Sequence, residues 1–551
     1  MPPRAQDVLA EISALLELQG ESPTLSSETT ASVTAELDET GESTLLDQLR
    51  ESTPEGLFEM MRVPGLGTAR IRRIFDGLHI DTLQELEAAA RDGRLATLPR
   101  FGAAAAEQVL RGIAALKESG AQVLLPHGRA EAERLLTLVR AHPGVARAEV
   151  AGAVRRFSEV VRDLDIVAGC RGTPETIAAQ LARSPAVRDS VGSGTRRVSI
   201  RFTDGTRLNL TCVPESEFVV AWWRATGSDA HVRDVVARAA MRRFTLGDST
   251  LSDSTGNGVA LADEASLYAA LGLPWMPPEL REGLGETRAA MSGELPQLVT
   301  ASDLRGVLHC HSQYSDGGAT IADLAAAAQG RGWSYLGVSD HSQSSFYAGG
   351  LTTESLARQH EEIDALNARL TDFRVLKGVE ADILPCGRVD YPVDVLDRFD
   401  YVIASVHSRF GMDETQMTHR VLKALDDPHV TILGHPTGRL LLTREPYAID
   451  MNAVLEKAAK SGVAVELNAD PHRLDLDWRL CRTARDHGTL IEIGPDAHSV
   501  DGLENIHLGI GMARKGWLSA ADVLNARSAD DVTAFAQARK ALKTPRIDAD
   551  R

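Results

Sequence analysis

Cysteine is scarce in this chain of 551 residues, which has five cysteines and no Cys-x-x-Cys pair. An odd, scattered set of thiols excludes a disulfide framework and a thiolate zinc finger, and it fits a reducing cytoplasm. Long apolar runs are also missing, since no stretch approaches the roughly 18 uncharged residues that a membrane helix needs. The first 20 residues carry acids within their apolar stretch and no small-residue cleavage site. We therefore expect neither a membrane span nor a signal peptide.

Basic residues are outnumbered, because 59 lysines and arginines face 77 acids and give a net charge of −18. The imbalance is uneven along the chain. Residues 1–60 hold 2 basic and 13 acidic residues, whereas residues 61–240 hold 26 basic and 20 acidic residues. The region after residue 240 is acidic again. A positive middle, in which nearly every basic residue is arginine, permits phosphate contacts there without requiring them.

Changes of composition divide the chain into five expected segments. Residues 1–53 begin with a helical pattern and continue into an acidic stretch rich in Ser and Thr, which we interpret as a linker. Short helices with Gly-bearing turns follow over residues 54–120, and a mixed α/β pattern covers residues 121–287. Residues 288–302 form the predicted junction to residues 303–551, which repeat a strand–loop–helix rhythm.

Histidines and acids gather at the ends of seven β-like runs in this last segment. Such runs, separated by helices, predict a parallel α/β barrel whose strands all end at one mouth. In an extended segment residues i and i+2 point the same way, so His309-x-His311 and Asp496-x-His498 would each present two ligands. Imidazole and carboxylate without thiolate suit zinc, manganese or iron, and nine ligands predict a cluster of two or three ions. The predicted metal ligands are His309, His311, Asp316, His341, Glu380, His407, His435, Asp496 and His498.

The chain resembles the PHP (polymerase and histidinol phosphatase) domain in the motifs RGVLHCHSQYSDG, GVSDHSQS, GVEADIL, FDYVIASVHSRF, ILGHPTGRLL, VELNADPHRLDL and GPDAHS. The likeness is to the version at the carboxyl end of bacterial X-family DNA polymerases (PolX). It implies a distorted seven-stranded barrel, a trinuclear site usually active with manganese, and hydrolysis of phosphoesters, here as a 3′–5′ exonuclease on DNA. Arg439 and Arg473 match family positions near the mouth, where they are either DNA phosphate ligands or ordinary surface arginines. Asp340, beside His341, is expected to orient a ligand.

The helical region after the linker contains a Gly-bearing turn, Val63-Pro-Gly65-Leu-Gly67, followed by Arg70. Glycines in such a turn let backbone N–H groups approach a phosphate at the positive end of the next helix. The turn resembles a helix-hairpin-helix DNA-binding motif, and a weaker second copy lies at residues 98–102. The resemblance implies contacts with the DNA backbone that do not depend on sequence.

The mixed α/β segment resembles the nucleotidyltransferase palm and thumb of X-family polymerases, in the motifs AGAVRRFSEVVRDLDIVAG, SVGSGTRRVSIRF, ATGSDAH and LYAALGLPWMPPELREGLGE. Asp163 and Asp165, two residues apart on one strand, would hold Mg²⁺ for phosphoryl transfer. The resemblance also implies nucleotide contacts at Gly152, Arg156 and Gly192.

Three departures from the family pattern point to a degenerate polymerase. Asn209 stands where the third metal carboxylate is expected, and Ala153 replaces the serine of the phosphate-binding turn. Arg224 and Ala225 replace an aromatic pair. An amide oxygen can ligate Mg²⁺, but it brings no charge to offset the repulsion and desolvation of the cation.

The sequence therefore predicts a multidomain α/β DNA repair protein of the PolX kind. Its PHP phosphoesterase would be intact and use Mn²⁺ or Zn²⁺, and its polymerase-like core would bind DNA. We expect gapped DNA or DNA 3′ ends as partners, dNTP with Mg²⁺ if the palm is active, no membrane partner, and a cytoplasmic, nucleoid-associated location. Three alternatives stay open: an active polymerase with 3′–5′ exonuclease, a non-catalytic DNA-binding scaffold, and a small-molecule phosphatase of the histidinol-phosphate kind.

Overall fold

The computed structural model describes residues 5–41 and 43–541, and the chain divides into two compact units. One unit joins Met1–Glu55 to Gln297–Arg551, and the other is Gly56–Pro296. The N-terminal segment thus groups with the carboxyl-terminal region rather than with the helices that follow it in sequence. None of the helices in the described ranges combines the length and apolar composition that crossing a membrane requires.

The N-terminal segment contains three helices, α1 (Ala5–Leu18), α2 (Ser27–Thr40) and α3 (Thr44–Glu51). The expectation of a linker after α1 was wrong, because α2 occupies most of that stretch. The Ser26 side chain accepts a hydrogen bond from the Thr29 N–H, and Gly41 ends the helix in the left-handed region at φ 75°. Good caps at both ends support a helix whose composition is poor in apolar residues.

The unit Gly56–Pro296 begins with helices packed around Gly-bearing turns. These are α4 (Glu55–Met61), α5 (Thr68–Leu78), α6 (Leu83–Asp92) and α7 (Ala103–Glu118), with a 3₁₀ turn at Arg94–Thr97. The predicted hairpin Val63–Gly67 connects α4 to α5, and Gly65 has φ 82°. A Cβ on Gly112 of α7 would lie 2.6 Å from the Pro64 carbonyl oxygen. The hairpin therefore rests directly on the backbone of α7.

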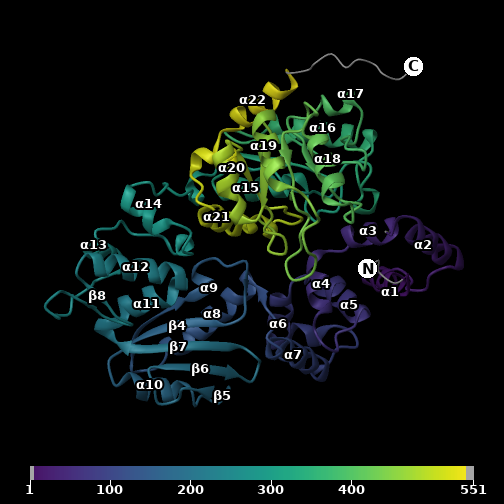
Figure 1. The fold of residues 1–551 in the computed structure, drawn as a ribbon. Coiled ribbons are helices and arrows are strands. Elements are labelled where there is room, and N and C mark those ends of the chain that lie inside the picture. The colour runs from purple at the N-terminus through teal and green to yellow at the C-terminus, as the bar shows by residue number, and fades with distance from the viewer. Residues whose placement is uncertain (1–4, 42, 542–551) are drawn as a thin grey trace. The chain divides into compact units, whose positions relative to one another are not determined.

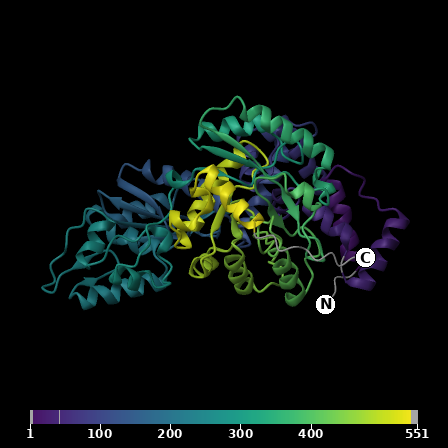
Figure 2. The same ribbon diagram turned by 90° about the horizontal axis from the view of Figure 1, so that it is seen from above.

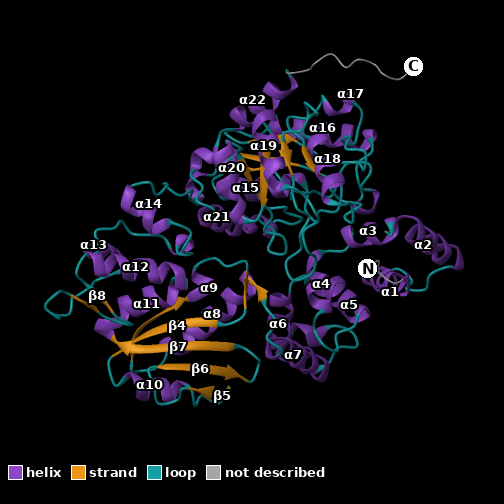
Figure 3. Ribbon diagram, viewed as in Figure 1, coloured by secondary structure: helices purple, strands orange, loops and turns teal. Residues whose placement is uncertain are grey.

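A five-stranded mixed sheet follows, in the order β2-β4-β7-β6-β5 (Figure 3). Its strands are β2 (Val145–Ala151), β4 (Leu164–Cys170), β5 (Val187–Val191), β6 (Arg197–Phe202) and β7 (Arg207–Pro214). Only β4 and β7 run parallel, and they form the centre of the sheet. Helices α8 (Leu125–Arg140), α10 (Pro174–Leu181) and α11 (Phe218–Thr226) pack against it. This is the expected palm.

The rest of this unit forms a small helical subdomain built on its own core. It comprises α12 (Asp229–Met241), α13 (Glu264–Ala270), α14 (Glu286–Ser292) and the short strands β8 (Thr245–Leu246) and β9 (Leu251–Ser252). Its core includes the fully buried side chains of Trp223, Val235, Leu267 and Tyr268. The position after the palm is that of the expected thumb.

The carboxyl-terminal region carries eight short parallel strands in two sheets that follow chain order. They are β10 (Gly306–Val307), β11 (Tyr335–Val338) and β12 (Arg374–Lys377), then β13 (Glu380–Asp382), β14 (Ile403–Ser405), β15 (Ile432–Leu433), β16 (Ala464–Asn468) and β17 (Ile491–Gly494). Because only two residues separate β12 from β13, these strands make the seven runs predicted from sequence. Parallel bridges between Cys310 and Ala497 and between His341 and Glu380 join the two sheets. The predicted distorted parallel barrel is confirmed.

Helices surround this barrel (Figures 1 and 2). They are α15 (Ile321–Gly330), α16 (Thr353–Asn367), α17 (Val393–Leu396), α18 (Glu414–Ala424), α19 (Met451–Ser461), α20 (Trp478–His487), α21 (Ile506–Lys515) and α22 (Ala529–Lys540). Leu308, just after β10, and the strand residues Ile403 and Ile432 share one buried core with Val532 and Ala536 of α22. The strands read as continuous apolar runs because helices cover the sheet and side chains fill its interior.

Candidate metal centre and polymerase-like site

Eight of the nine predicted metal ligands lie in loops that follow the barrel strands, and Glu380 begins β13, which only two residues separate from β12. Three sets have ligand atoms within 4.8 Å of one another, and we number them as subsites. Subsite 1 is His311, Asp316, His341 and His498; subsite 2 is His309, His311 and Asp496; subsite 3 is His341, Glu380 and His407. His311 and His341 each belong to two subsites. Such sharing suits a cluster of closely spaced ions.

Glu380 lies at the hub of this centre. Its Oε2 is 3.0 Å from His341 Nδ1 and 3.5 Å from His309 Nε2. Its Oε1 is 3.2 Å from His407 Nε2 and 2.8 Å from His435 Nε2. His435 therefore reaches the centre through Glu380, although it belongs to none of the three subsites. Asp496 has φ 49°, a conformation that costs energy for a residue other than glycine and is common at functional sites.

The donor atoms fit divalent metal ions. Several buried imidazole nitrogens have no hydrogen-bond partner among the described residues: His309 Nε2, both ring nitrogens of His311 and His435 Nδ1. Buried polar atoms without partners are costly, and a metal ion satisfies several of them at once. A set of imidazoles and carboxylates without thiolate suits manganese, zinc or iron. The residues present therefore fit a metal cluster.

The electrostatics of the centre also fit a cluster of metal ions. Burial opposes ionisation, yet the surrounding imidazoles hold the pKa of Asp316, Glu380 and Asp496 well below its usual range. Burial likewise opposes charge on His407, but Glu380 and Asp382 raise its pKa to about 10. Burial and the neighbouring rings of His498 and His341 lower the pKa of His311 to about 3. Protons and metal ions thus compete for the same nitrogens, so metal affinity depends on pH.

Two acids that contact ligand rings from the side away from the centre, Glu466 and Asp382, were not predicted from the sequence, whereas Asp340 was. Glu466 Oε1 lies 2.5 Å from His309 Nδ1, and Asp382 Oδ1 lies 2.6 Å from His407 Nδ1. A spacing signal was available for Asp382, because it follows Glu380 by two residues on one strand and so shares its face. Glu466 gave no such signal, since its partner lies 157 residues away in the chain.

The two arginines expected near the mouth differ in their surroundings. Arg439 is buried, and its guanidinium donates to the Arg473 carbonyl at 3.0 Å and to Asp477 at 3.1 Å. Arg473 places its Nε 3.6 Å from Asp496 Oδ2 and pairs through Nη2 with Glu55 at 2.6 Å. Arg439 thus supports the loop from which Arg473 reaches the metal centre.

In the polymerase-like triad, Asp165 and Asn209 lie on the paired strands β4 and β7 of the palm, and Asp163 lies just before β4. Asp165 of β4 is in register with Asn209 of β7, and Asn209 Nδ2 donates to Asp165 Oδ1 at 3.3 Å. The Asn209 amide oxygen accepts from Ser199 Oγ at 2.8 Å. Burial raises the pKa of Asp165 to about 6 although the bond from Asn209 opposes the shift. The amide therefore turns a donor, not a lone pair, toward the carboxylate.

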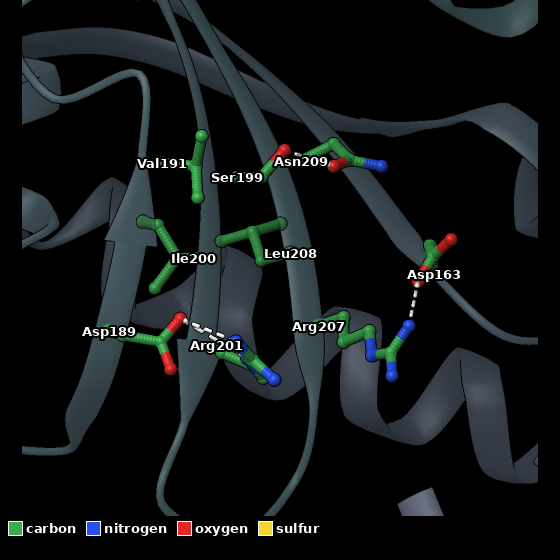
Figure 4. A pocket seen from close by; sticks show the side chains of 9 residues that line it. All are labelled: Asp163, Asp189, Val191, Ser199, Ile200, Arg201, Arg207, Leu208 and Asn209. Carbon is green, nitrogen blue, oxygen red and sulfur yellow. Dashed lines mark hydrogen bonds and ion pairs between the residues drawn. The ribbon is translucent and has the colours of Figure 1, made fainter. Parts of the chain in front are cut away.

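Asp163, the other predicted carboxylate, lines a pocket of about 370 Å³ on the palm (Figure 4). Arginines are its nearest charged partners, with Arg162 Nε at 3.3 Å and Arg207 Nη1 at 4.0 Å. Figure 4 also draws the ion pair of Arg201 with Asp189, 3.1 Å apart, in the same pocket. Two basic side chains thus face the position where a cation is expected.

Of the three predicted nucleotide contacts, Arg156 has other partners in this structure. Arg156 Nε pairs with Glu282 at 3.0 Å, and its Nη1 donates to the Thr226 carbonyl at 2.7 Å. Gly152 has φ 63°, and a Cβ there would lie 2.0 Å from Asp165 Oδ2. Gly192, at φ 83°, occupies the turn after β5. Gly152 is therefore required by its close approach to Asp165.

Comparison with known proteins decides the family. The chain is 37% identical over 516 residues to the DNA polymerase/3′-5′ exonuclease PolX of Bacillus subtilis, covering 92% of this chain and 89% of that protein. The chain belongs to the PolX family. It also matches the family models for the SAM-like helix-hairpin-helix tandem over residues 58–115, the DNA polymerase beta thumb over 221–282 and the PHP domain over 308–470.

Probable phosphatases are similar to about a third of the chain. One from Syntrophotalea carbinolica is 30% identical over 206 residues, which is 35% of this chain and 79% of that protein. Another, from Caldicellulosiruptor saccharolyticus, is 28% identical over 206 residues, which is 34% of this chain and 78% of that protein. Metal binding by the PHP domain and DNA as the partner of a PolX protein follow from these relationships.

One further acidic group in this PolX chain resembles a metal site but has another explanation. Glu87, His127 and Glu131 bring ligand atoms within 4.8 Å of one another. Lys117 Nζ, however, lies 2.8 Å from Glu87, and Arg134 lies 2.8 Å from Glu131. Cationic side chains already balance these carboxylates. The group joins α6, α7 and α8 as a buried ion network.

Proposed function

We propose that this chain is a metal-dependent phosphodiesterase that removes nucleotides from DNA 3′ ends, with a polymerase core that is degenerate. The observation that carries the proposal is the convergence of nine imidazole and carboxylate side chains at the mouth of the barrel, eight of them in three overlapping subsites and His435 in contact with Glu380. Residues 54–120 would hold the DNA backbone, and 121–287 would supply further DNA contact. The Bacillus subtilis relative named as a 3′-5′ exonuclease supports the choice of reaction.

The nine side chains would hold two or three Mn²⁺ or Zn²⁺ ions. When bound, such ions supply a water of lowered pKa and polarise the phosphoryl oxygens. Glu380 and Asp496 bring negative charge between the imidazoles, which balances the charge of closely spaced cations. Arg473, adjacent to Asp496, is suited to hold a phosphate oxygen. Cys310, between two ligands, is no candidate nucleophile, because burial raises the pKa of its thiol.

The degenerate polymerase is the finer part of the proposal. Three features support it: the Asn209 amide nitrogen directed at Asp165, the arginines beside Asp163, and the pairing of Arg156 with Glu282. Charge on both catalytic ions is needed for phosphoryl transfer, and the palm offers two carboxylates where the family pattern has three. Binding of dNTP and Mg²⁺ would accordingly be weak.

The test is a 5′-labelled primer-template incubated with Mn²⁺, with and without dNTPs, and analysed on a denaturing gel. We expect shortening from the 3′ end and no extension. Extension by the wild type would identify an active polymerase, and no change would favour a DNA-binding scaffold. Hydrolysis of small phosphomonoesters in place of DNA would favour a small-molecule phosphatase. The exposed residue His487 provides the control, because His487→Ala removes an imidazole that lies outside the metal centre.

A further inference from the structure

Three buried acids that are not among the nine predicted ligands lie directly behind the metal centre. Asp340, Asp382 and Glu466 have exposures of 1%, 8% and 0%. Glu466 contacts a ligand of subsite 2, Asp382 contacts a ligand of subsite 3, and Asp340 holds the turn that leads to Asp316 of subsite 1. We propose that these acids are positioning residues, each of which fixes the ligands of one subsite and so sets the metal affinity of that subsite. Glu466 would act on subsite 2, Asp382 on subsite 3 and Asp340 on subsite 1. This inference rests on the metal site proposed above.

Glu466 fixes the ligands of subsite 2. Its Oε1 lies 2.5 Å from His309 Nδ1, so this ring nitrogen carries the proton and Nε2 is directed to the centre, 3.4 Å from Asp496 Oδ1. Its Oε2 accepts the backbone N–H of His435 at 2.6 Å. Asn468 Nδ2 bonds Asp496 Oδ2 at 2.9 Å and reaches Glu466 Oε2 at 3.3 Å. One carboxylate thus sets both the ring and, through an amide, the acid of this subsite.

Asp382 does the same for subsite 3. Its Oδ1 lies 2.6 Å from His407 Nδ1, which leaves His407 Nε2 facing Glu380 Oε1 at 3.2 Å. Two hydroxyls hold the carboxylate in turn, with Ser344 Oγ and Ser345 Oγ each donating at 2.8 Å. A carboxylate behind a ligating imidazole fixes the tautomer and raises the basicity of the ring.

Asp340 acts on a loop rather than on a ring. It accepts from the Ser312 N–H at 2.7 Å, from Ser312 Oγ at 2.6 Å and from Gln359 Nε2 at 2.5 Å. Ser315 Oγ also donates to it. These bonds fix residues 312–315, the turn that precedes Asp316 of subsite 1. Asp340 would therefore set the position of Asp316 while its neighbour His341 supplies a ligand.

Glu492 offers a matched control for Glu466. The two acids are directly opposite each other on β17 and β16, and both are fully buried. Neither carboxylate oxygen of Glu492 has a hydrogen-bond partner among the described residues. Burial, together with Glu466, raises the pKa of Glu492 well above its usual range, which favours the neutral carboxyl. Glu492→Gln then keeps both charge and size, and we expect no change in metal binding.

The experiment measures metal binding to the full chain without DNA. Metal-stripped wild type, Glu466→Gln, Asp382→Asn, Asp340→Asn and Glu492→Gln are titrated with Mn²⁺ and with Zn²⁺, and bound metal is counted by mass spectrometry after equilibrium dialysis. Each acid variant should weaken one class of ion by about 10–100-fold, the usual cost of losing such support, while the other classes stay within about twofold. Circular dichroism and thermal unfolding check the fold.

Double variants identify the class that is lost. Glu466→Gln combined with His309→Ala should lose no more than His309→Ala alone, whereas Glu466→Gln with His407→Ala should lose two classes. Unchanged isotherms, or all classes weakened together in a folded protein, would overturn the proposed assignment of one acid to each subsite. If an acid variant does not fold, neighbouring side chains can be removed instead. Asn468→Ala removes the amide that joins Glu466 to Asp496, and Ser344→Ala with Ser345→Ala removes the hydroxyls that hold Asp382. If the protein binds metal in separate classes but does not cleave DNA, the proposed nuclease activity is wrong, while the proposed role of the three acids is kept.

Discussion

Asn209 and Asp165 lie opposite each other on parallel strands, and the amide nitrogen of Asn209 donates to Asp165 Oδ1 at 3.3 Å. A carboxylate at position 209 would bring a second negative charge to this point, and a cation would be needed between the two. The amide instead satisfies Asp165 without a cation. Asn209 thus places a hydrogen-bond donor where the family pattern has a third carboxylate.

Restoring the carboxylate should not restore the polymerase. Asn209→Asp is expected to give only slight primer extension, because Arg156 stays paired with Glu282 and Ala153 offers no hydroxyl to the nucleotide. Loss of a single preorganised catalytic contact commonly costs about 10²–10³ in rate, and these defects affect different steps. Extension is measured with the nuclease silenced by His341→Ala. Robust templated synthesis by His341→Ala alone would refute the degenerate palm.

Removing a shared ligand should cost more than removing a ligand of one subsite. His341 belongs to subsites 1 and 3, whereas His498 belongs to subsite 1 alone. His341→Ala and Asp496→Ala should both abolish nuclease activity. His341→Ala should also lower bound metal by more than one ion, while His498→Ala should lose at most one. Activity on 5′-labelled DNA and metal content are measured together, with His487→Ala as control. Wild-type activity in His341→Ala or Asp496→Ala would show the site assignment to be wrong.

The buried ion pair of Glu264 with Arg281 should matter for stability. Both side chains are buried, the pair distance is 2.7 Å, and Arg155 binds the same carboxylate. Glu264→Gln leaves the fully buried Arg281 without its counter-charge, which costs about 3–5 kcal/mol. Calorimetric unfolding measures the loss. The control, Asp248→Asn, breaks an exposed pair with Arg197 and should change stability by less than about 1 kcal/mol.

The same carboxylate predicts an acid sensitivity. Burial raises the pKa of Glu264, but Arg281 and Arg155 outweigh it and lower the pKa to about 2. A lowered folded-state pKa means that the stabilisation is complete above the ordinary value near 4.5 and is lost as the pH falls toward 2. Unfolding curves between these limits should therefore converge for wild type and Glu264→Gln. A constant difference over that range would contradict the assignment.

DNA binding should depend on the packing of the Val63–Gly67 hairpin against Gly112 of α7. Gly112→Ala would press a methyl group against the Pro64 carbonyl, 2.6 Å from its Cβ, and displace the turn. We expect weaker binding to duplex DNA and a smaller salt dependence, since each lost phosphate contact removes about 0.9 from the log–log slope. Gly258→Ala, which meets nothing within 4 Å, is the control. Equal affinity and slope in both variants would exclude the hairpin as a DNA contact.

Substituting Arg473 or Arg439, the two arginines of the barrel mouth, should affect different properties of the protein. Arg473→Ala should raise KM for DNA by about tenfold, because its guanidinium lies beside Asp496. Arg439→Ala should lower thermal stability first, because it leaves buried carbonyl groups of the 473–477 loop unpaired. Steady-state kinetics and thermal unfolding of both variants show which arginine binds DNA and which stabilises the fold. The reverse pattern would exchange the two roles.

The sequence by itself was sufficient to name the nine side chains that the barrel brings together. Parallel strands all end at one mouth, so a histidine or acid at each strand end must lie near the others whatever the details of packing. The seven strand runs and the left-handed Gly65 turn could be read in the same way, since each is a local pattern. The acidic N-terminal stretch was misjudged because caps at Ser26 and Gly41 outweighed its composition.

Only the tertiary structure decided which partners the buried charges have. His309 meets Glu466 across 157 residues of chain, and Arg156 meets Glu282 across 126. The direction of the Asn209 amide likewise depends on Ser199, which is held on the neighbouring strand. A buried charge must find its counter-charge or hydrogen-bond partner wherever the fold supplies one, and no local pattern records that choice.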